Sequence, residues 1–72
     1  MEHIQVILLD LPAAVPGLTI RNEDDSYTIF INARLSSDMQ CKEYDRQIGY
    51  IEAQNYDKIY DVKILEHIGQ VG

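Results

Sequence analysis

The sequence predicts an α+β fold in which a three-stranded antiparallel sheet carries two helices packed on one face. Three short segments, residues 4–9, 18–22 and 27–32, have the length and the apolar or alternating composition of strands. After residue 36 the apolar residues recur at steps of three and four, the period of an amphipathic helix. Because the chain has only 72 residues, we expect one small domain, residues 1–72, without room for a second layer.

The first strand is predicted at Ile4–Leu9, where the sequence is apolar on both faces after Gln5. Such a run is typical of a strand that is covered on both sides or central in its sheet. Asp10 ends the run, and two prolines with a glycine make residues 11–17 a connecting loop.

The second and third strands form a predicted β-hairpin. Residues 18–22 alternate apolar and polar side chains, which is the pattern of a half-buried strand. Residues 27–32 are aromatic and β-branched, and this composition favours a strand. The polar residues 23–26 between them are predicted to form the turn.

The first helix is predicted from about Ser37 to about Gln54. Ser37 and Gln40 lie at the spacing of a capping box, which favours a helix start here. One stripe of residues at steps of three, four and three is predicted to face the sheet: Cys41, Tyr44, Ile48 and Ile51.

A second helix is predicted to begin near Asp57 or Asp61 and to end at Gly69. Its inward-facing residues would be Val62, Leu65 and Ile68. The predicted order of three strands followed by two helices is what assigns the chain to the α+β class.

Charge and composition exclude several classes of function. Twelve acidic and six basic residues give a net charge of -6, and the bases never form a run. Nucleic acid and anionic membrane are therefore poor partners. No apolar run approaches the ~20 residues of a membrane span, and the N-terminus lacks the basic start of a signal peptide. The single cysteine excludes a disulfide framework, so we expect a cytoplasmic protein.

Spacing alone identifies no cofactor or metal site. The four glycines are too dispersed for a phosphate-binding loop, and no serine has a nucleophile-elbow setting. Cys41 lies on the predicted buried stripe, which favours a small core residue over a nucleophile. His3 and His67 stand at opposite ends of the chain, and no spacing gathers them with other ligands. We therefore predict neither a cofactor nor a metal.

The segment DSYTIFINARLS at residues 25–36, followed by Gln40 and an amphipathic helix, resembles the ImmA/IrrE family of small zincin-like metallopeptidases. It is most similar to short single-domain members found in Firmicutes and their mobile elements. In that group a strand of this type leads into a helix with the His-Glu-x-x-His zinc motif. The likeness extends from residues 6–12 to the last predicted helix and implies a zincin-like minimal core.

The catalytic motif of the family is replaced in this chain. The resemblance places Arg46, Gln47 and Tyr50 where the family has His, Glu and His. Zinc hydrolysis needs two imidazoles one helical turn apart and a carboxylate that takes a proton from the metal-bound water. A guanidinium has no acceptor, an amide is not a base, and a tyrosine ligates only as phenolate. The resemblance therefore implies a protein that is not an enzyme.

The family's third zinc ligand is an acidic residue on the following helix, which implies Glu66 at that position. The alternative for Glu66 is a solvated carboxylate on a short terminal helix. One hypothesis places the Arg46 guanidinium where zinc would sit, paired with Glu66 and stacked on Tyr50. The alternative for Arg46 is an ordinary solvated helix residue with Lys42 and Glu43 as neighbours.

Three functions of different classes remain open. The favoured one is an inactive relative of the peptidases that binds a protein or peptide along an edge of the sheet, at a hairpin strand beside Arg46 and Tyr50. The second is a metal-dependent hydrolase with atypical ligands, such as Asp45, Glu66 and His67, whose spacing does not favour a site. The third is a small self-associating domain, such as a homodimer, with five tyrosines to supply aromatic surface.

Overall fold

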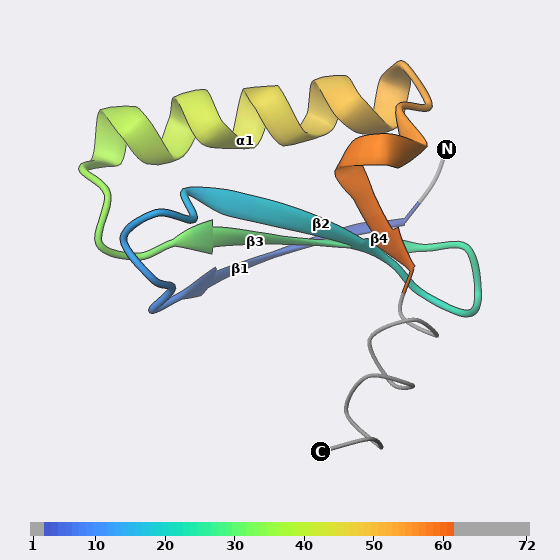
Figure 1. Ribbon diagram of the computed structural model, residues 1–72, viewed down its shortest axis with the longest axis horizontal. Helices are drawn as coiled ribbons and strands as arrows, with labels where there is room; N and C mark the ends of the chain where they lie inside the picture. Colours follow the sequence, from blue (N-terminus) through green and yellow to red (C-terminus); the bar gives the residue numbers. More distant parts are fainter. Residues whose placement is uncertain (1–2, 62–72) are drawn as a thin grey trace.

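The computed structural model describes residues 3–61, which form a four-stranded mixed sheet with one long helix on one face (Figure 1). The elements in chain order are the strands, the helix and a short 3-10 helix: β1 (Ile4–Leu9), β2 (Gly17–Arg21), β3 (Tyr27–Asn32), α1 (Ser37–Glu52), η1 (Tyr56–Lys58) and β4 (Ile59–Asp61). The predicted α+β class is confirmed. The predicted three-stranded antiparallel sheet is wrong in its strand number and its strand directions, and most of the predicted second helix lies outside the described residues.

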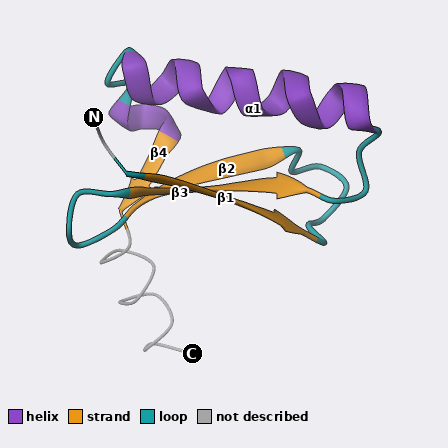
Figure 2. Cartoon of the chain, turned by 180° about the vertical axis from the view of Figure 1, so that it is seen from behind, coloured by secondary structure: helices purple, strands orange, loops and turns teal. Residues whose placement is uncertain are grey.

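The strand order in the sheet is β1-β3-β2-β4 (Figure 2). The predicted hairpin is present, because β2 and β3 pair antiparallel from Gly17 opposite Ile31 to Arg21 opposite Tyr27. β1 pairs with the far side of β3 and runs parallel to it. The residue 10–16 loop takes the chain past β3 and reverses it, so β1 and β2 run in opposite directions on either side of β3.

The side chain of Asn32 holds that loop in place. Asn32 is buried, and its amide donates to the backbone carbonyls of Leu11, Pro12 and Val15 at 3.0–3.2 Å. Its Oδ1 accepts the backbone N–H groups of Leu11 at 3.4 Å and Arg34 at 3.0 Å. The parallel placement of β1 therefore depends on hydrogen bonds across the end of β3.

An exposed ion pair joins the residue that follows β1 to the segment that follows β3. The Arg34 Nε donates to Asp10 Oδ1 at 2.6 Å. This hydrogen bond and the positive charge of Arg34 lower the pKa of Asp10, and the same contact raises the pKa of Arg34.

Residues 56–61, which follow α1, form a short 3-10 helix and a fourth strand. α1 ends at Glu52, two residues before the predicted end, and Gln54 has a φ of 53° in the left-handed region that terminates helices. Asp57 lies in the three-residue η1 and residues 59–61 form β4, so the predicted helix does not begin at Asp57. The remainder of the predicted second helix, residues 62–69, lies outside the described residues.

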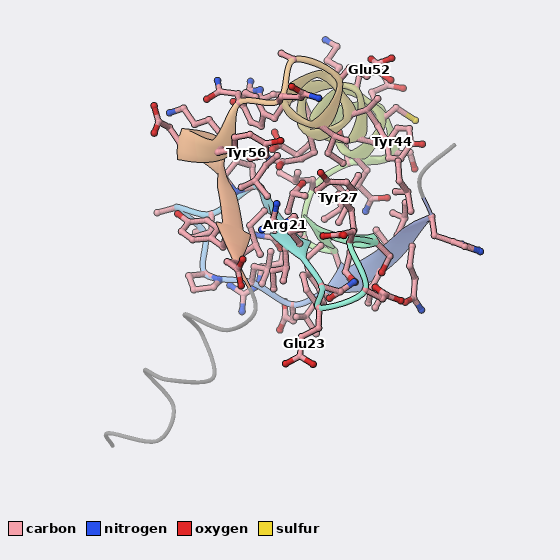
Figure 3. The ribbon with its side chains drawn as sticks, turned by 90° about the vertical axis from the view of Figure 1, so that its right-hand side faces the viewer. Arg21, Glu23, Tyr27, Tyr44, Glu52 and Tyr56 are labelled. Carbon is pink, nitrogen blue, oxygen red and sulfur yellow. The ribbon has the colours of Figure 1, made fainter. Side chains whose placement is uncertain are left out.

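β4 is attached to β2 by backbone pairing and by the side chain of Arg21. It pairs parallel to β2 at Thr19–Arg21. Arg21 Nη2 donates to Asp61 Oδ2 at 3.2 Å, and its guanidinium lies 5.9 Å from the ring centre of Tyr56 (Figure 3). These contacts bring the segment after the helix back to the edge of the sheet.

The core lies between α1 and the sheet, where the helix packs mainly on β3 and β2. Its buried apolar side chains are Tyr27, Ile29 and Ile31 of β3 together with Ile51 of α1. The alternation of β2 places Thr19, and not its apolar neighbours, on this face, and Thr19 is fully buried. The polar row of the second strand therefore faces the helix.

The helix also differs from its predicted capping and buried face. Ser36 is the N-cap, one residue earlier than predicted, and its side chain accepts the Met39 N–H at 3.3 Å. Ile51 is buried and Ile48 half-buried as predicted, but Cys41 and Tyr44 are exposed. Their places on the buried face are taken by the polar residues Glu43 and Gln47.

Candidate functional site

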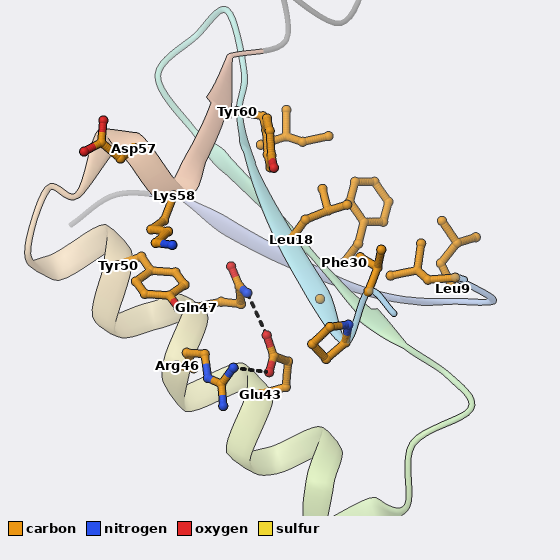
Figure 4. Close-up of a pocket in the computed structure, with 15 residues that line it drawn as sticks. Leu9, Leu18, Phe30, Glu43, Arg46, Gln47, Tyr50, Asp57, Lys58 and Tyr60 are labelled. Atoms are coloured by element: carbon orange, nitrogen blue, oxygen red, sulfur yellow. Dashed lines mark hydrogen bonds and ion pairs between the residues drawn. The ribbon is translucent and has the colours of Figure 1, made fainter. Parts of the chain in front are cut away.

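A pocket of about 550 Å³ wraps around the outer edge of β2, between α1 and the segment of η1 and β4 (Figure 4). On the helix side it is lined by four residues of α1: Glu43, Arg46, Gln47 and Tyr50. Around the strand edge the wall is mostly apolar and comes from both faces of the sheet region: Leu9, Leu11, Val15, Pro16, Gly17, Leu18, Ile20, Phe30 and Tyr60. Asp57 and Lys58 complete the rim.

Three of the four residues that the resemblance singled out meet in this pocket. Arg46 and Tyr50 lie one helical turn apart, with Gln47 directed between α1 and β2. Glu66, the fourth, lies outside the described residues, so its pairing with Arg46 stays a prediction.

Gln47 is the centre of a buried polar network. Its Oε1 accepts the hydroxyl of Thr19 at 2.8 Å, and its Nε2 donates to Glu43 Oε2 at 2.7 Å. The exposed fraction is 4% for Gln47 and 0% for Thr19. Among the described residues, no buried side-chain nitrogen or oxygen lacks a hydrogen-bond partner. This pairing explains why polar residues of both the helix and the strand can occupy the interface.

Glu43 is a buried carboxylate that sequence reasoning did not single out. It is 4% exposed and lies 3.7 Å from Arg46 Nη1 in an ion pair across one helical turn. Gly17 makes space for it, since a Cβ at Gly17 would lie 2.8 Å from Glu43 Cγ and 2.9 Å from the Phe30 carbonyl oxygen. Two features of the sequence could have indicated this contact. Glu43 and Gln47 are four residues apart and so share one face of the helix, and a glycine stands at the start of the second strand.

The hypothesised stacking of Arg46 on Tyr50 is not found among the described residues. The Arg46 side chain is 60% exposed, and its ion-pair partner is Glu43. Within residues 3–61 the cation–π contact is that of Arg21 over Tyr56, so Arg46 is not stacked on Tyr50. The neighbour relation to Glu43 agrees with the simpler of the two alternatives for Arg46.

The residues that the resemblance places at the metal positions do not fit a zinc ion. Arg46 brings a positive charge without an acceptor, and the Gln47 oxygen already accepts the Thr19 hydroxyl. In the part of the chain that the structure describes, no three His, Cys, Asp or Glu side chains gather as a metal site would require. Asp45, one of the atypical ligands considered, lines a separate groove with Cys41 and Tyr44.

The outer edge of β2 is open beside the pocket. β4 pairs with β2 only from Thr19 onward, which leaves Gly17 and Leu18 beyond the end of the pairing. The Asn32 N–H donates to the Pro16 carbonyl, so the alternation of the ladder directs the Gly17 N–H and C=O away from β3. The predicted edge on a hairpin strand is thus confined to the first residues of β2, because β3 is interior and the rest of β2 is paired.

Comparison of the chain with protein-family models, with curated proteins and with solved structures gave no match. Over residues 3–61, no helix is both long enough and apolar enough to cross a bilayer.

Proposed function

We propose that this chain is a catalytically inactive relative of the ImmA/IrrE metallopeptidases, with a zincin-like minimal core, that binds an extended segment of a protein partner. The observation that carries the proposal is the open edge of β2 at Gly17 and Leu18, which lies inside a pocket that also contains Arg46, Gln47 and Tyr50. The proposal includes a cytoplasmic location, because a chain with a single cysteine cannot form the internal disulfides common in small secreted domains.

The proposed binding mode is addition of a short strand to β2, in line with β4. The Gly17 N–H and C=O supply the backbone hydrogen bonds, and alternate side chains of the bound segment turn to opposite faces. One set contacts the apolar wall formed by Leu18, Phe30 and Tyr60, and the other turns toward α1. There the exposed Arg46 guanidinium donates to an acceptor of the bound segment.

The hydrogen bonds of the Gln47 side chain support the proposed loss of catalysis. In the family register this residue replaces the general base, and its amide is fixed by hydrogen bonds to Thr19 and Glu43. An amide neither accepts a proton at neutral pH nor polarises water as a carboxylate does. The pocket still offers an apolar wall and the Arg46 guanidinium, and both can contact a bound segment.

The test is selection of peptides from a random display library on the immobilised protein, followed by fluorescence anisotropy with the selected sequence. We expect Arg46→Ala to weaken the Kd by about tenfold, the value of one charge-assisted hydrogen bond. Lys42→Ala is the matched control, because Lys42 is an exposed cation on the same helix that does not line the pocket. It should leave the Kd unchanged.

Two results would contradict the proposal. Equal affinity in wild type and Arg46→Ala would place the binding surface elsewhere. Cleavage of the selected peptide on incubation with added zinc, detected by mass spectrometry, would show that the protein is an enzyme.

A further inference from the structure

The outer edge of β1 is a second open edge, on the opposite side of the sheet from the pocket. β1 stands last in the strand order, and within the described residues no strand pairs with its outer side. Open edges attract other strands because their N–H and C=O groups lack partners, and proteins usually protect them with charges, prolines or bulges. Ile4–Leu9 contains neither a charged residue nor a proline, and its register with β3 runs without a bulge.

The backbone of β1 presents three residues outward. The Tyr27 N–H donates to the His3 carbonyl and the Ala33 N–H to the Leu9 carbonyl. In a parallel ladder this sets the alternation, so the odd-numbered residues of β1 pair with β3. The N–H and C=O groups of Ile4, Val6 and Leu8 therefore point away from the sheet.

The side chains of this edge form an uncovered apolar surface. Val6 is 45% exposed and Leu8 56%, because α1 packs mainly on β2 and β3 and leaves the helix-side face of β1 open. Both residues line a groove of about 410 Å³ together with the exposed side chains of Cys41 and Tyr44. Figure 3 shows Tyr44 on the β1 side of the helix, away from Tyr56.

We propose that this edge binds a second copy of the chain, with the two β1 strands antiparallel and Val6 opposite Val6. The outward residues are symmetric about Val6, so Ile4 then lies opposite Leu8 of the other copy. Each such pair exchanges two backbone hydrogen bonds, as a two-fold interface requires. The two sheets thereby become one continuous sheet.

The absence of charge along β1 and the symmetry of its outward residues about Val6 are the reasons to choose a second copy as the occupant. Each chain carries a net charge of -6, so two copies repel wherever acidic surface meets acidic surface. β1 itself carries no charged side chain, so the two paired strands place no like charges directly opposite each other, and the acidic residue that lines the groove beside it, Asp45, belongs to α1. Pairing also covers Val6 and Leu8 and adds apolar contacts to a core with few buried side chains. This inference goes beyond the proposed function, since the β2 pocket stays open in such a dimer.

Sedimentation equilibrium of the full chain tests the inference. Wild type should sediment as a dimer, and Leu8→Lys should halve the mass, because a charge on an edge strand opposes pairing. Met39→Lys is the matched control, since Met39 is 48% exposed and lies about 160° around α1 from Cys41. This control should remain dimeric. Circular dichroism reports whether each variant is folded.

A second variant keeps the test decisive if Leu8→Lys does not fold. Val6→Pro removes an outward N–H and leaves the bonds to β3 in place, so it should also be a folded monomer. Cys41, the single thiol of the chain, should react faster with a maleimide in this variant than in wild type. A monomeric wild type, or a dimer that persists in the folded Val6→Pro variant, would overturn the inference. Neither result bears on peptide binding by the β2 pocket.

Discussion

Replacement of Gln47 by glutamate tests the buried network, since it introduces the residue that the proposed ImmA/IrrE relationship implies while changing only one group. In the native network the amide donates to Glu43 Oε2 across 2.7 Å. A carboxylate at position 47 would face the Glu43 carboxylate in a site that is almost completely buried. Two negative charges about 4 Å apart repel by about 4 kcal/mol at an effective dielectric constant of about 20. This repulsion raises the pKa of the carboxyl introduced at position 47.

The pair in Gln47→Glu should therefore retain one proton well above the usual glutamate pKa of about 4.3. The protonated form donates to Glu43 as the amide does, so stability is largely preserved at low pH. A pKa that is raised in the folded state means that this stability is lost as the pH rises, between about 4.3 and about 7. We expect an unfolding free energy close to wild type at about pH 5 and lower by about 2–4 kcal/mol at about pH 8.

Urea denaturation followed by circular dichroism at the two pH values measures this difference. The matched control is the exchange variant Glu43→Gln with Gln47→Glu, which keeps one carboxylate and one amide in the same site. Its stability should not differ from wild type in this pH-dependent way. An equal loss in Gln47→Glu at both pH values, or a pH-dependent loss in the exchange variant, would refute the reasoning.

Three further predictions concern the elements that position the site. Gly17→Ala should lower the unfolding free energy by about 1–3 kcal/mol, because the added Cβ meets the Glu43 side chain, and denaturant titration checks this value. Asn32→Ala should lower the unfolding free energy by about 3–4 kcal/mol, because the backbone groups of the loop that this side chain bonds are left without partners. An unfolding free energy equal to wild type in the same titration would contradict this role of Asn32. The Asp10–Arg34 pair lowers the pKa of Asp10 below its usual 3.8, so its contribution is present above that pH and is lost as the pH falls through the lowered pKa. Thermal melts at decreasing pH should accordingly show a weaker acid dependence in Asp10→Asn than in wild type.

Local patterns were sufficient to identify the strands of the hairpin and the first strand. The strand limits predicted from composition and turn residues lie within one residue of the observed limits. The neighbour of β1 could not be read in the same way, because it depends on Asn32, which bonds to loop groups about twenty residues earlier in the chain. β4 was missed for a similar reason, since a three-residue strand has too short a pattern to compete with a helical interpretation.

The buried face of the helix was misplaced because periodicity assumes that the buried residues are apolar. Glu43 and Gln47 violate that assumption, and their burial becomes favourable only with Thr19 as a partner on a different element. Of the candidate site, Arg46, Gln47 and Tyr50 were named from the resemblance and are brought together in one pocket. Gly17 and Glu43 depend on a contact between strand and helix, which no local pattern contains.

The strand order also sets the sequence in which parts of the sheet should assemble and open. The β2–β3 hairpin joins neighbouring segments, whereas β1 pairs with residues 23 positions later and β4 with residues 40 positions earlier. Closing longer loops costs more chain entropy, so we expect the hairpin to form first and the two outer strands to join it later. In a single, undimerised copy the amides of β3 should then exchange with deuterium most slowly, and those of β1 and β4 should exchange first. The two outermost strands of a single copy, β1 and β4, are thus the ones expected to leave the sheet most readily.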